Sequence, residues 1–79
     1  VRIHGDVAKT IDLSGGIPGV NILVFEKCFD LSRIIWPDDT GFIHKLFINS
    51  AESLTHLDIS ELHNLQQLYI INCPALTKI

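Results

Sequence analysis

The stretch LHNLQQLYIINCPALTKI, residues 62–79, places an aliphatic residue or a cysteine at every second or third position. An amphipathic helix would place apolar residues at i, i+3, i+4 and i+7. The Leu68-Tyr69-Ile70 triplet instead alternates, and it uses the aromatic and β-branched residues that strands favour. We therefore predict a short strand here, followed by a turn.

The same spacing recurs along the whole chain. An apolar residue returns at every eleventh or twelfth position, at Ile11, Leu23, Ile34, Leu46, Leu57, Leu68 and Ile79. A unit this short cannot form a coil that returns and stacks on itself, so two units should form one coil, which doubles the period. A second ladder shows this doubled period, because Asp6, Cys28, Ala51 and Cys73 recur at every twenty-second or twenty-third position.

These residues resemble a known family. LQQLYIINCPALTKI is similar to the LxxLxLxx(N/C)xxL segment of leucine-rich repeats, particularly the cysteine-containing class, and VNILVFEKCFDLSRI and IHKLFINSAESLTHL repeat it. LSRIIWPDDTGFIHKLFINSAESL further resembles the 23-residue repeat of bacterial surface-antigen leucine-rich proteins, including the proline after the second strand. The resemblance covers residues 20–79. Residues 14–19, SGGIPG, interrupt the pattern, and Asp6, Thr40 and Ala51 depart from it.

The resemblance implies a β-rich leucine-rich-repeat solenoid with a parallel sheet on its concave side and short extended segments opposite. We expect one domain, residues 1–79, with about three and a half turns at residues 1–22, 23–45, 46–67 and 68–79. The third turn should bury Leu46, Ile48, Ala51, Leu54, Leu57, Ile59, Leu62 and Leu65. Because uncovered ends expose sheet edge or core, we expect either a piece of a longer array or end-to-end self-association through residues 68–79.

Composition argues against two classes of partner. The formal net charge is -3, and no basic block is present that would hold a nucleic-acid backbone. No apolar run approaches the ~20 residues that span a bilayer, and the N-terminus VRIHGDVAK lacks the apolar stretch of a signal peptide. We therefore expect neither nucleic-acid binding nor membrane insertion.

The two cysteines could be nucleophiles or metal ligands, but we interpret them as small, buried residues between turns. Cys28 and Cys73 lie two turns apart, which is roughly 9.6 Å for strands ~4.8 Å apart. A disulfide needs a Cα separation of about 4.4 to 6.8 Å. Both cysteines should therefore be free thiols.

Histidines and acidic pairs give no stronger indication of chemistry. The histidines occupy different registers of the predicted coil, and no pair has the i, i+4 spacing of a zinc helix; they are His4, His44, His56 and His63. Asp38 and Asp39 lie in WPDDTG, where proline, aspartate and glycine favour a turn. A carboxylate pair that cleaves sugars would have to face a cleft. We predict no catalytic residues, no metal site and no cofactor.

The concave sheet supplies the candidate site. Because side chains alternate along a strand, stacking should align an outward row of Arg2, Val24, Phe47 and Tyr69, with His4, Glu26, Asn49 and Ile71 on one flank and Ile22, Lys45 and Gln67 on the other. An exposed apolar stripe flanked by mixed charges is typical of protein-binding surfaces. The alternative is that cross-strand packing alone favours these residue types. We predict that the partner contacts Arg2, Val24, Glu26, Lys45, Phe47, Asn49, Gln67, Tyr69 and Ile71.

The predicted function is non-enzymatic recognition of another protein through the concave face. Two alternatives stay open: a carbohydrate-acting β-solenoid, whose aromatic row would stack on sugars, and a purely structural repeat spacer. The surface-antigen resemblance implies an exported or cell-surface bacterial adhesion protein. The plant-resistance type of repeat, which NLQQLYIINCPALTKI equally resembles, implies a cytoplasmic sensor or scaffold.

Overall fold

Six short strands form two parallel sheets in the computed structural model, which describes residues 2–5, 7–15 and 21–77. The larger sheet has the order β1-β3-β5-β6 and consists of β1 (Arg2–His4), β3 (Ile22–Glu26), β5 (Lys45–Asn49) and β6 (Gln67–Ile71). The smaller sheet pairs β2 (Thr10–Asp12) with β4 (Arg33–Ile35). None of the described residues is helical. The predicted β-rich class with a parallel sheet is confirmed.

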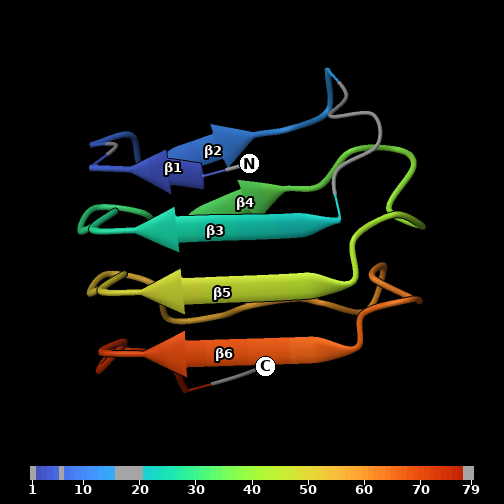
Figure 1. The fold of residues 1–79 in the computed structure, drawn as a ribbon. Coiled ribbons are helices and arrows are strands. Elements are labelled where there is room, and N and C mark those ends of the chain that lie inside the picture. The colour runs from blue at the N-terminus through green and yellow to red at the C-terminus, as the bar shows by residue number, and fades with distance from the viewer. Residues whose placement is uncertain (1, 6, 16–20, 78–79) are drawn as a thin grey trace.

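Crossover connections make both sheets parallel. After β1 and β3 the chain crosses to the smaller sheet and then returns to the larger one. Figure 1 shows β1, β3, β5 and β6 pointing the same way, with β2 and β4 behind them pointing the opposite way. Parallel strands cannot be joined by a tight hairpin and need a long crossover. The long connections between successive strands of the larger sheet supply it.

The register of the larger sheet matches the spacing in the sequence. Leu23 pairs with Leu46, and Leu46 with Leu68, so the leucines that the repeat aligned are cross-strand neighbours. Along β3 and β5 the burial alternates, because successive side chains point to opposite faces of the sheet. One face packs on the core. The opposite face is termed the outer face below.

The residue that follows each strand of the larger sheet has a positive φ angle, in the left-handed region of backbone conformation. Gly5, Lys27, Ser50 and Asn72 have φ angles of 69°, 54°, 64° and 54°. The N–H groups of the first three extend the sheet's hydrogen bonding by donating to the carbonyls of Glu26, Asn49 and Ile71. This backbone geometry directs the following residue inward, and Cys28 and Ala51 at that position are fully buried. The small side chains of this ladder therefore fill the space beside the turn.

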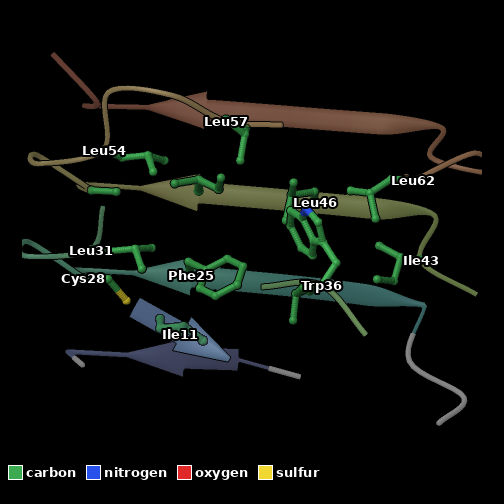
Figure 2. Packing of buried hydrophobic residues seen from close by; sticks show 13 residues of the cluster. Ile11, Phe25, Cys28, Leu31, Trp36, Ile43, Leu46, Leu54, Leu57 and Leu62 are labelled. Atoms are coloured by element: carbon green, nitrogen blue, oxygen red, sulfur yellow. The ribbon is translucent and has the colours of Figure 1, made fainter. Parts of the chain in front are cut away.

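The core lies between the two sheets. Figure 2 shows Phe25 and Leu46 of the larger sheet packing towards Ile11 and Trp36, which come from the opposite side. Of the eight residues predicted to be buried in the third turn, six are buried, whereas Ile59 and Leu65 are only half-buried. Each fully buried large aliphatic side chain contributes roughly 1.5 to 3 kcal/mol. The buried side chains of this layer, together with Leu23, Phe25, Leu31 and Ile43 of the preceding turn, form most of the core.

One further expectation needs correction. Cys73 was predicted to be buried but is half-buried, because it follows β6, which is an edge strand of the larger sheet. Residues 55–59, which lie in the corresponding segment of the third turn, do not pair with β4. Two residues that the sequence placed in the ladders, Asp6 and Ile79, lie outside the described residues.

A hydrogen bond explains the presence of Thr40 at a position where the sequence pattern predicts an aliphatic residue. Thr40 is 7% exposed, and its hydroxyl donates to the carbonyl of Glu61. Nearby, the side-chain amide of Asn64 donates to the carbonyl of Gly41 at 3.0 Å. These two bonds join neighbouring connections at the end of the fold where the chain enters β5 and β6. The polar residue in the core is therefore satisfied by its neighbour in the next connection.

Candidate functional site

The structure brings all nine predicted partner-binding residues together on the outer face. β1 carries Arg2, β3 carries Val24 and Glu26, β5 carries Lys45, Phe47 and Asn49, and β6 carries Gln67, Tyr69 and Ile71. The register pairs Arg2 with Val24, Val24 with Phe47, and Phe47 with Tyr69. All nine residues are exposed or half-buried. The flanking residues that the sequence assigned to this face, His4 and Ile22, are exposed as well.

An aromatic pair forms the centre of this face. The ring centroids of Phe47 and Tyr69 are 5.9 Å apart, with an angle of 39° between the ring planes. The ammonium of Lys45 lies 5.5 Å from the centroid of the Tyr69 ring, within the range of a cation–π interaction. Tyr69 is nevertheless 43% exposed. The two rings therefore form one aromatic surface that is held by these contacts and partly open to solvent.

The charges on this face are distributed unevenly. The guanidinium of Arg2 and the carboxylate of Glu26 form an ion pair at 2.7 Å, with 62% and 23% of their side chains exposed. Exposed pairs of this kind contribute about 1 kcal/mol or less to stability. Lys45 has no ion-pair partner among the described residues. The ammonium group that has no ion-pair partner thus lies beside the aromatic pair.

Polar and aliphatic groups border the aromatic pair towards the strand ends. The side-chain oxygen of Asn49 accepts hydrogen bonds from the Ser50 hydroxyl at 3.0 Å and the Asn72 amide at 3.5 Å. Beside Asn49 in the register lies Ile71, which is exposed. The face therefore combines an apolar stripe with oriented amide groups.

The cysteines are free thiols, as predicted. The thiol of Cys28 lies 3.5 Å from the Glu26 carbonyl, and that of Cys73 lies 3.3 Å from the Ile71 carbonyl. Each thiol thus has a weak acceptor two residues before it in the chain. These contacts agree with the interpretation of both cysteines as small residues that fill the space beside a turn.

The other titratable residues are spread over the surface. Among residues 2–5, 7–15 and 21–77, no group of three or more histidines, cysteines or acids could hold a metal ion. His44 is half-buried, and His4, His56 and His63 are exposed. Asp39 accepts a hydrogen bond from the N–H of Gly41 at 3.1 Å, which closes the turn that the sequence predicted.

Two more carboxylates close turns that the sequence did not indicate. Asp12 and Asp58 each accept a hydrogen bond from the backbone N–H of the serine two residues later, at 2.8 and 2.9 Å. Hydrogen bonding to Ser14 and Ser60 lowers the pKa of the two carboxyls below 3.8. These aspartates occupy corresponding positions of the connections, with Ile35 between them in the pattern.

A groove on the side of the smaller sheet was also missed. It has a volume of about 460 Å³, and its lining comprises Ser32, Arg33, Ile34, Ile35, Trp36, Leu54, His56, Leu57, Asp58 and Glu61. A second, shallower depression of about 430 Å³ is lined by Ser50, Glu52, Asn72, Cys73 and Pro74. The sequence signal for the first groove was Trp36, which stands where Leu13 and Ile59 stand in the other connections.

Comparison with known proteins adds no assignment: no family model, no curated protein and no solved structure matches this chain. Within the described ranges, no helix is long and apolar enough to cross a membrane.

Proposed function

We propose that this chain is a non-enzymatic recognition module of the leucine-rich-repeat solenoid type. It would bind another protein through the outer face of the four-stranded sheet, the concave face in such a solenoid. The spacing in the sequence supports the solenoid fold, and the register of the larger sheet agrees with that spacing. The side chains on the outer face support the proposed function.

The functional proposal rests on one observation: the exposed Tyr69 packs against the half-buried Phe47, with Lys45 beside it. Tyrosine is enriched among the residues that contribute most to binding energy in protein interfaces, because it offers a large contact area with few rotatable bonds. Here the neighbouring ring and ammonium already restrict Tyr69. A partner that covers it would therefore lose little side-chain entropy on binding.

The composition of the surrounding surface also favours a protein partner. Val24 and Ile71 extend the apolar centre, while the Arg2–Glu26 pair and the amide of Asn49 lie at its margin. Protein interfaces share this arrangement of an apolar centre and a polar rim. An acidic or hydroxyl group of the partner beside an apolar residue would complement Lys45 and Tyr69 together.

The test is the double substitution of Phe47 and Tyr69 by alanine. The matched control replaces Phe29 and Phe42, two exposed aromatic residues in turns away from the outer face. The proposal expects the first variant, but not the control, to lose a partner captured by the unmodified chain, with unchanged circular dichroism. A change only in oligomer size would instead identify the stripe as a self-association surface. Retained partner binding would refute the site.

A further inference from the structure

The smaller sheet is interrupted beside β4. Between β2 and β4, the backbone N–H of Leu13 donates to the carbonyl of Ile35 at 2.8 Å. One step along the fold, the corresponding acceptor is the carbonyl of Asp58. It receives the indole N–H of Trp36, also at 2.8 Å, instead of a backbone N–H. The indole of Trp36 therefore joins β4 to the next segment, whereas a direct backbone hydrogen bond joins β2 to β4.

The size of Trp36 accounts for the interruption. Leu13 and Ile59 occupy the corresponding positions in the neighbouring connections, and Trp36 is only 8% exposed. The bulky indole must therefore fit between layers that elsewhere contain an aliphatic side chain. In Figure 1, β4 lies just above β3, whereas the connection that follows β5 runs below β5, so the two segments diverge. The groove of about 460 Å³ occupies this region.

β4 consequently has a free edge. The N–H of Arg33 and the carbonyl of Ile35 bond to the side of β2. Because backbone groups of alternate residues point to opposite sides of a parallel strand, the N–H and C=O of Ile34 face the groove. Among the described residues, no strand pairs with this edge. Both Ile34 and Leu57, on the other wall, line the groove.

Arg33 adds an unpaired cation to this edge. Its guanidinium has no hydrogen-bond or ion-pair partner among the described residues, and Arg33 lines the groove. Asp58 and Glu61 lie on the opposite wall. A carboxylate in the groove would therefore be drawn to the β4 side, where a guanidinium can bind it through two parallel hydrogen bonds.

We propose that this groove binds an extended peptide segment of a partner protein. The segment would add its backbone to the free edge of β4 at Ile34 and place an aspartate or glutamate side chain against Arg33. Strand addition fits this site because the edge offers one donor and one acceptor in strand geometry, and the apolar side chains of Ile34, Leu57 and Trp36 line the groove beside it. The site lies on the smaller sheet and does not depend on the function proposed for the outer face.

The experiment is an amide chemical-shift titration of the ¹⁵N-labelled chain. The probes are two blocked seven-residue peptides of alternating threonine and valine, one with a central aspartate and one with a central lysine. We expect saturable shifts at the amides of Ile34 and Leu57, and affinity about tenfold higher for the aspartate peptide. Arg33→Glu changes an exposed position and should make the lysine peptide bind more tightly than the aspartate peptide. Trp36→Leu should close the groove and abolish binding, whereas Phe29→Leu should leave binding unchanged.

Several outcomes would overturn the proposal. It fails if the aspartate peptide gives no saturable shift at Ile34 up to about 1 mM, a concentration that would reveal even weak binding. It also fails if the shifts map to the edge strands β1 and β6, or if both peptides bind Arg33→Glu as they bind the unmodified chain. The Arg33 variant keeps the test decisive even if Trp36→Leu does not fold.

Discussion

The indole N–H of Trp36 donates a hydrogen bond to the backbone carbonyl of Asp58 at 2.8 Å, across a region where the smaller sheet has no backbone pairing among the described residues. Trp36 thus fills the core, satisfies the Asp58 carbonyl and separates β4 from the next connection. The bulk and the indole N–H of this one residue account for all three effects.

Trp36→Phe should separate the hydrogen bond from the bulk. Phenylalanine retains an aromatic ring but lacks the N–H, which leaves the Asp58 carbonyl without its donor. Because Asp58 is exposed and lines the groove, water can replace the lost donor, so we expect the free energy of unfolding to fall by about 0.5 to 1.5 kcal/mol, the usual net contribution of one hydrogen bond. Urea denaturation measures this change. A variant as stable as the unmodified chain would show that the bond contributes nothing.

Thr40→Val tests the polar residue in the core. Valine has nearly the same shape, but it cannot donate to the carbonyl of Glu61. We expect a loss of about 1 to 2 kcal/mol in the free energy of unfolding. Thr55→Val is a useful comparison, because Thr55 is exposed and its hydroxyl bonds with the ring of His56, its neighbour in the chain. An equal effect at the two positions would argue against a specific role for the Thr40 bond.

Lys27→Gly should stabilise the fold. Lys27 has a φ angle of 54°, in the left-handed region where a Cβ is unfavourable by roughly 1 to 2 kcal/mol. Glycine removes that cost but loses more entropy on folding, so we expect a net gain of about 0.5 to 1 kcal/mol. Lys9→Gly is the matched control, since Lys9 is exposed and has no positive φ angle. Thermal unfolding should show a higher Tm for Lys27→Gly and a lower Tm for Lys9→Gly. A change in Tm of the same sign in both variants would contradict the assignment of backbone strain to Lys27.

Stability should depend on pH through Asp12 and Asp58. Hydrogen bonds from Ser14 and Ser60 lower the pKa of both carboxyls in the folded chain below 3.8. A lowered pKa means that the unfolded chain binds protons first as the pH falls. The stabilisation is therefore fully present above about pH 5 and is lost as the pH falls through 3.8 and below. Asp12→Asn with Asp58→Asn should flatten this acid limb in urea titrations from pH 6 to 2.5.

The control for the pH experiment is Asp38→Asn with Asp30→Asn, which removes the same formal charge at two exposed positions. If these substitutions flatten the acid limb as much as those at Asp12 and Asp58, overall charge rather than the two turns controls the pH dependence.

Most of the larger sheet was predictable from sequence, because its register follows directly from spacing. Leu23, Leu46 and Leu68 recur at the period of the fold and become cross-strand neighbours. The nine residues of the outer face follow from the same register, since alternation along a strand fixes which side chains point away from the core. Spacing alone therefore placed the candidate site.

Features that depend on side-chain volume or on hydrogen bonds between connections were not predictable. The pattern treats Trp36 as one more apolar residue, whereas its size interrupts the smaller sheet. It treats Thr40 as a departure, because the acceptor at Glu61 comes from the next connection. Likewise, Leu65 and Cys73 match the buried pattern but are half-buried beside an edge strand. A repeat pattern reports position along the chain and contains no information on packing between layers.

The central claim is that a protein partner binds the outer face at the aromatic pair. The most direct measurement is the dissociation constant of an isolated partner for three chains: the unmodified chain, Phe47→Ala with Tyr69→Ala, and the control Phe29→Ala with Phe42→Ala. Interface residues of this type contribute about 2 kcal/mol each, so the first variant should bind at least about 100-fold more weakly while the control binds normally. Equal affinity for all three chains, with circular dichroism unchanged, would contradict the claim.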